Sequence, residues 1–366
     1  MSLPLCVGAV ASGPSKYNKS PVMASKATSI DIAYRAGVSQ STVSRALRDS
    51  PLVSPETKEK IRAIARELNY KVDKNASNLR TQNSHTLALL LCEDPTNDDS
   101  LINPFFLSML GSITRATAKQ GYDLLVSFQQ LSSDWHADYE DSNKADGIIL
   151  LGYGDFVDYE HKLERLLAQN THFVIWGAEH NKSTVASVGC DNQQGGLIAT
   201  EHLLSLGRKS VAFLGDASSH SPEFRDRYLG HVRALKDAGL VADKRCQVDA
   251  ISTESAGFDA ANKLIRKGAQ FDAIFAASDL IAIGAIRALK EAGLRVPEDV
   301  AVVGYDDIPV ASFANPPLTT IKQNTQLAGE MLVESLLKLI HGEAVPPRLI
   351  PTSLVVRKSC GIDLGD

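Results

Sequence analysis

The chain of 366 residues is 44% hydrophobic and 22% charged, which is the composition of globular domains and excludes a disordered or fibrous protein. Its length predicts two or three domains, each large enough to bury a core. The formal net charge is −5, but residues 23–85 hold eleven Lys or Arg against six Asp or Glu, so the rest of the chain is acidic. A basic N-terminal part on an acidic body fits a phosphate-binding module joined to a body that does not attract DNA.

The cysteines and the apolar runs indicate the compartment. Five cysteines are scattered, with no CxxC pair and no histidine partner at zinc spacing, which favours a reduced, cytoplasmic protein without a metal. No run reaches the roughly 18 apolar residues that span a bilayer, so no membrane partner is expected. The N-terminal LPLCVGAVA lacks the charged flank of a signal peptide. We expect residues 1–25 to be a disordered extension, with Met23 as an alternative start.

Residues 28–47 predict two short helices. Thr28 is an N-cap, and Asp31 three residues later completes a variant of the capping box. Gly37 supplies the left-handed residue that ends the first helix, and Ser39 caps the second. Two short helices joined by a glycine turn form the helix-turn-helix pattern, although an ordinary surface hairpin carries the same signals.

The second helix carries short polar side chains and one cation on its outward face. Such groups suit base edges in the major groove, and the hydroxyls can anchor on phosphate. A third helix is predicted from Ser54, because a serine N-cap followed by Pro55 at the first helical position is a strong start signal. The outward-facing residues of the second helix are Gln40, Ser41, Thr42, Ser44 and Arg45. The expected three-helix core consists of Ile32, Ala36, Val43, Leu47, Ile61, Ile64, Ala65 and Leu68.

The stretch ATSIDIAYRAGVSQSTVSRALRDSPLVSPETKEKIRAIARELNY closely resembles the DNA-binding headpiece of the LacI/GalR (lactose-repressor) family. The run IDIAxxAGVSxxTVSRAL followed by ELNY is a specific signature, and the resemblance extends from Met23 to the C-terminus. It implies a sequence-specific transcription regulator, expected to be a repressor, that binds double-stranded operator DNA. The implied parts are a helix-turn-helix domain at 26–71, a hinge at 72–84 and an effector-binding and dimerisation domain at 85–366. The residues expected to contact operator DNA are Thr28, Ser39, Gln40, Ser41, Thr42, Ser44, Arg45, Ser54, Thr57, Asn69, Tyr70, Asn75, Ala76 and Leu79.

In that family the hinge folds into a short helix on operator DNA, and here it corresponds to DKNASNLR, residues 73–80. Leu79 matches the leucine that family members insert into the minor groove, where unstacking of bases is offset by the extra contacts of bent DNA. This chain has Val72 and Asp73 where the family usually has a proline, so entry into the hinge helix is less constrained. A plain polar linker would have the same composition.

From Thr86 onward, short apolar strands alternate with helices. This alternation, with strands that are almost entirely apolar, predicts parallel sheets covered on both faces, and the chain is long enough for two of them. The polar stretch 129–146 replaces a full crossover helix and predicts an irregular connection. Strands are expected at 86–91, 123–128, 147–151, 173–176, 210–214, 272–276, 300–303 and 353–356. Helices are expected at 105–120, 159–169, 193–206, 225–238, 255–267, 280–292 and 325–340.

The family resemblance implies that this α/β body is periplasmic-binding-protein-like. It would consist of two Rossmann-like lobes behind an all-α headpiece with a hinge helix. The first lobe is expected at roughly 85–185 plus 325–345, and the second at 186–324 plus 346–366. The C-terminal CGIDLGD contains no heptad repeat, which favours a homodimer over a tetramer.

Ligands of open parallel sheets bind beyond the C-terminal ends of the strands, so polar residues that follow the strands are candidates. By resemblance, Asp306 and Gln323 in the inter-lobe crossover and Arg227 in RYLG contact the effector. Taken singly, Trp176 could be core, Arg227 a surface ion pair, and Asp279 a helix N-cap. The expected ligand-binding residues are Phe105, Trp176, Arg227, Ser278, Asp279, Asp306 and Gln323.

An indole beside carboxylates and an arginine is typical of a carbohydrate site, because the ring stacks on sugar C–H faces. The effector is therefore expected to be a small carbohydrate, with a glucoside preferred because of Trp176 and a neutral sugar preferred because basic clusters are lacking. Whether the sugar acts as inducer or corepressor stays open, since only its differential affinity for the two states matters.

Two other classes of protein share parts of this pattern. Paired Rossmann-like lobes suit dehydrogenases, but no GxGxxG follows the first strand, and GxxxxGK[ST], GxSxG and a metal-spaced histidine pair are also missing from the sequence. We therefore expect no catalytic residues, no cofactor and no metal. A periplasmic sugar-binding protein would have the same body, together with a secretion signal and no helix-turn-helix.

Overall fold

The computed structural model describes residues 27–70, 83–92, 102–152, 154–177 and 185–361. The chain divides into two compact units, 1–77 and 78–366. The predicted N-terminal extension lies outside the described residues, as do the predicted hinge contacts Asn75, Ala76 and Leu79.

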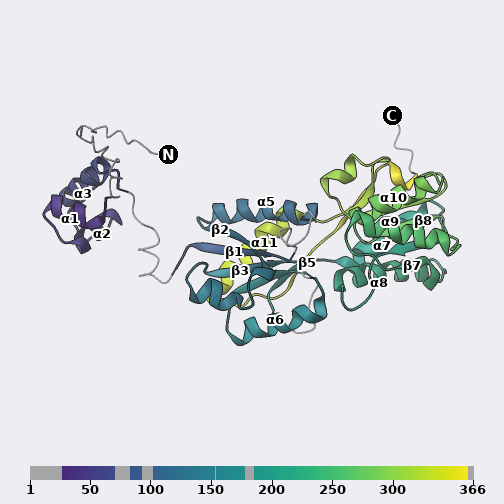
Figure 1. Ribbon diagram of the computed structural model, residues 1–366, viewed down its shortest axis with the longest axis horizontal. Coiled ribbons are helices and arrows are strands. Elements are labelled where there is room, and N and C mark those ends of the chain that lie inside the picture. Colours follow the sequence, from purple (N-terminus) through teal and green to yellow (C-terminus); the bar gives the residue numbers. More distant parts are fainter. Residues whose placement is uncertain (1–26, 71–82, 93–101, 153, 178–184, 362–366) are drawn as a thin grey trace, which may run out of the picture. The chain divides into compact units, whose positions relative to one another are not determined.

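Residues 27–70 form three helices, each of which begins at a side-chain cap. Thr28 and Asp31 complete a reciprocal capping box, and the Ser39 and Ser54 hydroxyls each accept a backbone N–H of their helix. Gly37 ends the first helix with a left-handed φ of 70°. The predicted helix starts and the predicted turn are therefore confirmed. The helices are α1 (Ser29–Ala36), α2 (Gln40–Leu47) and α3 (Pro55–Glu67) (Figure 1).

A small apolar core holds these helices together. Helices as short as α1 and α2, eight residues each, are not stable alone, so this core fixes the recognition helix. Ile30 and Tyr34 of α1 are exposed, because the buried stripe of α1 runs through Ile32, Ala33 and Ala36. The buried residues are Ile32, Ala33, Ala36, Val43, Ala46, Val53, Ile61 and Ala65, with Leu47, Ile64 and Leu68 packed against them.

The first lobe of the body contains a six-stranded sheet in the order β11-β5-β4-β3-β1-β2, and its paired strands are parallel. Side chains of β1 alternate between two cores: Leu89 packs with α5 and α11, whereas Leu90 packs with α6. Figure 1 shows α5 and α11 on one face of this sheet and α6 on the other. The strands are β1 (Thr86–Leu91), β2 (Asp123–Phe128), β3 (Gly147–Leu151), β4 (Phe173–Trp176), β5 (Ser187–Cys190) and β11 (Arg348–Ile350). The helices are α5 (Pro104–Lys119), α6 (Phe156–Ala168) and α11 (Thr325–Ile340).

The connection from β2 to β3 is irregular, as predicted. It contains a 3-10 turn, η1 (Gln129–Leu131), and a single π-helical turn, η2 (His136–Asp141). Trp135 lies between them, buried, and its indole N–H donates to the Gln129 carbonyl at 3.1 Å. This hydrogen bond fixes the indole, which covers β3 in place of a longer crossover helix.

The second lobe contains a six-stranded sheet in the order β12-β10-β9-β8-β6-β7. Its strand pairs are parallel except β10 with β12, which is antiparallel. The strands are β6 (Val211–Leu214), β7 (Gln247–Val248), β8 (Ala273–Ala276), β9 (Ala301–Asp306), β10 (Thr319–Lys322) and β12 (Ser353–Val355). The helices are α7 (Asn192–Ser205), α8 (Pro222–Asp237), α9 (Glu254–Arg266) and α10 (Asp279–Glu291), with short turns η3 (Lys244–Cys246), η4 (Pro309–Ser312) and η5 (Lys358–Cys360).

The predicted boundary between the lobes is wrong at two places. Strand β5 and strand β11 pair with each other in the first sheet, whereas residues 186–190 and 346–350 were expected in the second lobe. Strands β5, β7, β10 and β11 were not predicted at all. Each of these strands has only two to four residues, too few to show a periodicity, and its place is set by long-range pairing.

Candidate DNA-binding surface and effector site

The outward face of α2 presents three of the predicted base-reading residues, Gln40, Ser41 and Arg45, to solvent. Gln40 Nε2 donates to Ser29 Oγ at 2.8 Å, which joins the start of α2 to α1. The Ser39 hydroxyl lies 2.8 Å from that of Ser41. Arg45 is exposed, and no residue in the described part of the chain forms a hydrogen bond or ion pair with its side chain. Its guanidinium is therefore available for an outside acceptor.

The other predicted contacts in the headpiece lie at helix ends. Thr28 and Ser54 are the exposed N-caps of α1 and α3, and the Ser54 hydroxyl lies 2.8 Å from that of Thr57. Thr42 and Ser44 of α2 are half-buried, and Ser44 accepts from Arg48 at 3.2 Å. Helix N-termini with hydroxyl caps are suited to phosphate oxygens, because their backbone N–H groups point outward.

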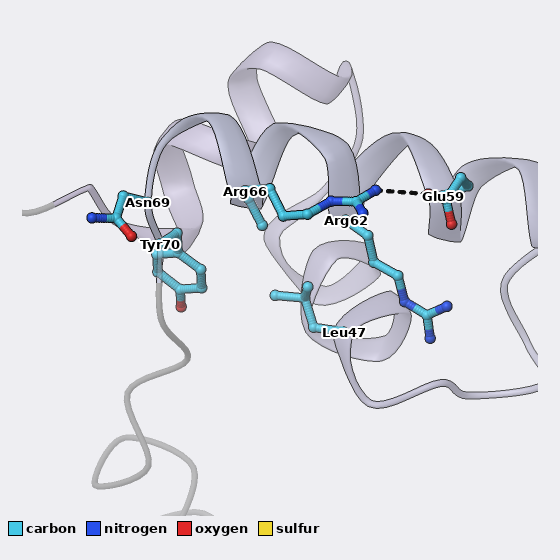
Figure 2. A pocket seen from close by; sticks show the side chains of 7 residues that line it. Leu47, Glu59, Arg62, Arg66, Asn69 and Tyr70 are labelled. Carbon is cyan, nitrogen blue, oxygen red and sulfur yellow. Dashed lines mark hydrogen bonds and ion pairs between the residues drawn. The ribbon is translucent and has the colours of Figure 1, made fainter.

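Asn69 and Tyr70 lie in an open groove at the end of α3. Figure 2 shows this groove, whose volume is about 510 Å³. Its cations are not free: Arg66 donates to Glu59 at 2.8 Å, and Arg62 donates to Asp49 at 2.8 Å. The groove therefore does not offer an uncompensated anion site. Its lining residues are Leu47, Glu59, Arg62, Ala65, Arg66, Asn69 and Tyr70.

In the body, Arg227 is held by a close contact between two helices. A Cβ added to Gly196 of α7 would lie 2.0 Å from the Arg227 carbonyl oxygen, so only glycine allows α7 and α8 to approach this closely. The buried guanidinium donates through Nε to Asn192 Oδ1 at 2.9 Å and through an η nitrogen to the Ala277 carbonyl. It also lies 3.7 Å from the centre of the Tyr305 ring. The surface ion pair considered for Arg227 is therefore wrong.

Asp306, at the end of β9, lies between Arg227 and Gln323. Gln323 Nε2 donates to Asp306 Oδ1 at 2.6 Å, and an Arg227 η nitrogen lies 3.7 Å from the same oxygen. Burial raises the pKa of Asp306 to about 6, although the Arg227 charge and the Gln323 hydrogen bond both oppose the shift. The structure thus brings three of the predicted effector residues into one buried polar cluster.

Asp279 does not present its carboxylate to this cluster. Thr320 Oγ1 donates to one of its oxygens at 2.5 Å, and the Ile308 backbone N–H donates to the other at 2.9 Å. The side chain is 0% exposed, and burial raises its pKa well above the usual value. The N-cap of α10 is Ser278 rather than Asp279. Asp279 therefore braces the turn after β9, and its fully buried side chain presents neither oxygen to a ligand.

Phe105 and Trp176 form an aromatic pair in the first lobe, with ring centres 5.9 Å apart. Phe105 lies at the start of α5 and Trp176 ends β4, and both are buried in the larger apolar core. Ser278 is buried, and its hydroxyl accepts from Ser252 at 2.9 Å. Ser252 in turn accepts from Asn103 of the first lobe at 3.1 Å.

Several residues of the site were missed from the sequence. Asn192 follows β5, so recognition of that short strand would have placed it at a strand end beside Arg227. Tyr305 was missed because it contacts Arg227 through its aromatic ring, and no sequence pattern marks such a contact. Ser252 and Asn103 lie in loops, where no local pattern marks a contact between lobes.

A helix-turn-helix headpiece and a two-lobed body with a polar cluster at its strand ends define a ligand-responsive DNA-binding regulator. Residues 30–73 match the family described as bacterial regulatory proteins, lacI family, and residues 200–360 match a periplasmic binding protein-like domain. The chain is 32% identical over 335 residues to the HTH-type transcriptional regulator CelR of Thermobifida fusca, spanning 90% of this chain and 96% of CelR. It belongs to the LacI family of bacterial transcription regulators.

Other relatives and solved structures align with a similar share of this chain. The HTH-type transcriptional regulator AscG of Escherichia coli is 29% identical, spanning 91% of this chain and 98% of AscG. The CelR–cellobiose complex aligns with a TM-score of 0.68 at 30% identity, over 91% of this chain and 99% of that one. The lac repressor dimer bound to operator and the anti-inducer ONPF aligns with a TM-score of 0.78 at 28% identity, with the same coverage. In the described ranges of this chain, helices are too short or too polar to cross a membrane.

Proposed function

We propose that this chain represses transcription from operator DNA in the cytoplasm and that a small neutral sugar bound between its lobes sets its operator affinity. The observation that carries this proposal is the buried cluster of Arg227, Asp306 and Gln323 at the C-terminal edge of the second sheet. A carboxylate, a guanidinium and an amide offer both donors and acceptors at nearly balanced charge. Asp306 accepts a hydrogen bond from Gln323 and forms an ion pair with Arg227, and sugar hydroxyls can replace these contacts.

A glucoside is the preferred effector. Phe105 and Trp176, whose rings are tilted by 45° to each other, are aromatic side chains of the kind that stacks on pyranose C–H faces. The relative CelR, whose solved complex contains cellobiose, supports the same class of ligand. We also infer that the chain acts by binding and not by catalysis, because the relatives it matches along nearly its whole length are regulators.

Calorimetric titration with cellobiose and a panel of other mono- and disaccharides tests this proposal. Arg227→Ala should abolish binding of the active sugar, because it removes the buried donor beside Asp306. Arg233→Ala on the same helix is the matched control, since the Arg233 side chain is exposed and pairs with Asp237 of its own helix. If Arg227→Ala binds the sugar as the parent protein does, the effector site lies elsewhere.

The DNA-binding surface requires two headpieces to read two half-sites of a near-palindrome, because a two-fold dimer imposes its symmetry on the operator. We propose that the dimer contact includes a shallow groove of about 290 Å³ on α10. The groove is apolar at its centre, carries both Arg287 and Glu291 on its rim, and lies near Phe313, which is 85% exposed. A patch with charges of both signs and an exposed ring can complement itself across a two-fold axis.

A fluorescence anisotropy titration of operator DNA, with and without cellobiose, shows whether the sugar strengthens or weakens operator binding. Tighter binding with the sugar would identify a corepressor, and weaker binding would identify an inducer. An operator affinity that no sugar of the panel changes would refute control by a carbohydrate, while leaving the DNA-binding assignment intact.

A further inference from the structure

A carboxylate of the first lobe clamps the chain just before it enters strand β1. Asp146, the residue before β3, accepts from the Ser84 backbone N–H at 2.6 Å through one oxygen and from the His85 backbone N–H at 2.9 Å through the other. The Ser84 hydroxyl also donates to the first oxygen, at 2.8 Å. The backbone N–H of Asp146 donates to the Thr86 carbonyl at 2.8 Å. Asp146 therefore holds three consecutive residues with its side chain and its main chain.

The clamped segment has an unusual backbone. His85 has a left-handed φ of 49°, which is uncommon for a residue other than glycine and persists only where surrounding contacts impose it. Its carbonyl accepts from the Asp123 N–H at 2.8 Å, and its ring lies edge-on to Tyr122 with ring centres 5.4 Å apart. A left-handed residue at the start of an extended strand changes the course of the chain. These contacts therefore fix the direction in which the chain passes from β1 toward the headpiece.

The second lobe contains the same clamp. Asp272, the residue before β8, accepts from the Lys209 N–H at 2.8 Å and from the Ser210 N–H at 3.0 Å, and its own N–H donates to the Ser210 carbonyl at 3.0 Å. Lys209 and Ser210 precede β6 as Ser84 and His85 precede β1, and both carboxylate side chains are half-buried. Of these four residues, all within the described ranges, only His85 has a positive φ.

The two clamps differ in what they hold. At Asp272 the incoming chain comes from α7, which packs on the strands of the same lobe, so both ends of that connection are fixed by one body. At Asp146 the incoming chain comes from the headpiece, which belongs to a separate compact unit. The same local device therefore occupies, in the first lobe, the place where the chain of the headpiece joins the sheet.

We propose that Asp146 is a positioning residue for operator binding: by fixing where and in which direction the chain leaves the body, it holds the two headpieces of a dimer in register with two half-sites. Two linked modules bind a double site tightly only when their linkers suit its spacing, because loose linkers lower the effective concentration of the second module. Residues that are freed at the junction must also be ordered again on DNA, which costs conformational entropy. This role rests on the proposed binding of operator DNA by a dimer, and it is independent of the sugar.

Asp146→Asn opens the clamp with little change of shape. An amide has one oxygen, so its nitrogen must face one of the two backbone N–H groups that the carboxylate accepts, and a donor then meets a donor. Asp272→Asn makes the same change in the second lobe and is the matched control. Each variant loses one negative charge, which by itself strengthens attraction to phosphate, so weaker operator binding cannot be a charge effect. We expect Asp146→Asn to lower operator affinity about 5- to 30-fold, as for the loss of one charge-assisted hydrogen bond.

Fluorescence anisotropy with the full-length protein measures this loss on two labelled duplexes. One carries the near-palindrome that the parent protein selects from a random pool, and the other is a shuffled sequence of the same composition. Asp146→Asn should lose affinity for the first duplex and keep the parent's affinity for the second, because each headpiece retains its own contacts. Asp272→Asn should bind both duplexes as the parent does. Ser84→Ala removes only the hydroxyl contact and should lower operator affinity about 2- to 5-fold, which tests the clamp even if Asp146→Asn does not fold.

Amide hydrogen exchange shows whether the two variants are matched locally. Exchange should become faster at Ser84 and His85 in Asp146→Asn, and at Lys209 and Ser210 in Asp272→Asn. A merely structural role would lower the affinity for both duplexes in proportion to the unfolded protein, which urea unfolding measures.

Three results would overturn the role of Asp146. These are unchanged exchange at Ser84 and His85 in Asp146→Asn, operator affinity equal to the parent's despite faster exchange, and an equal loss of operator affinity in Asp272→Asn. A parent protein that selects no sequence from the pool would instead refute the proposed function on which this role rests, so the two failures are distinguishable.

Discussion

Replacement of Asp306 by asparagine should stabilise the body at neutral pH and abolish its response to sugar. The Asp306 side chain is buried, and burial raises its pKa from 3.8 to about 6 even though Arg227 and Gln323 favour the charged form. Between these two pH values the folded protein holds a proton that the unfolded chain has already lost. The free energy of unfolding therefore falls as pH rises through this range.

The magnitude follows from the shift. The stability contributed by the protonated carboxyl is fully present below about pH 3.8 and is lost once pH passes about 6. A shift of this size corresponds to a loss on the order of 3 kcal/mol at neutral pH. Asparagine has nearly the same shape and no charge to bury, so it keeps the stability of the protonated form at every pH. Burial and then the Asp306 charge raise the pKa of Asp279, so Asp306→Asn also removes part of that upward shift, which stabilises the variant in the same direction at neutral pH.

Urea unfolding followed by circular dichroism, at several values between about pH 4 and pH 7.5, measures this difference. The variant and the parent should be equally stable near pH 4, and the variant should become more stable as pH rises. Asp307→Asn is a control of opposite sign, because Asp307 accepts from Arg357 at 2.7 Å and its loss removes the carboxylate that balances this cation. A difference between Asp306→Asn and the parent that does not change with pH would refute the reasoning.

Three further outcomes are expected. Arg45→Ala should weaken operator binding by about 1–3 kcal/mol if the free guanidinium contacts a base, and an unchanged anisotropy titration would exclude that role. Thr28→Ala removes one half of the capping box and should destabilise the headpiece by about 0.5–2 kcal/mol in a thermal melt. Phe313→Asp should shift the protein toward monomer in sedimentation, and a dimer as stable as the parent's would place the interface elsewhere.

Local signals in the sequence were enough to predict the headpiece. Caps at Thr28, Ser39 and Ser54 fix where its helices start, and a glycine at position 37 fixes the turn, so each helix could be placed without knowledge of its neighbours. The longer strands of the body were predicted for a similar reason, because a run such as 86–91 is almost entirely apolar, as strands of a parallel sheet covered on both faces are.

The features that could not be predicted from the sequence depend on contacts between distant segments of the chain. Strand β11 exists only because it pairs with β5, more than a hundred residues earlier in the chain. The roles of Asp279 and Asp306 could not be separated from sequence either, because both are acidic residues near strand ends. The structure separates them through their partners: Thr320 and the Ile308 backbone occupy Asp279, whereas Asp306 keeps an oxygen that faces Arg227 and Gln323.

The position of Asp306 also indicates how a ligand could move one lobe against the other. Asp306 and Asp307 are consecutive non-glycine residues with φ of 114° and 56°, so the turn after β9 is strained. Such strain costs about 1–3 kcal/mol per residue and persists only where surrounding contacts impose it. Those contacts come from Asp279 on the Ile308 backbone, Arg357 on Asp307 and Gln323 on Asp306.

Gln323 lies two residues before the start of α11, which packs on the first sheet. A sugar hydroxyl that replaces the Gln323–Asp306 bond removes one of the three restraints on the strained turn. The chain that is released leads directly through Asn324 into α11. We therefore expect that a ligand contact at Asp306 would relieve strain in the second lobe, act on the first lobe through this covalent connection and favour a different arrangement of the lobes.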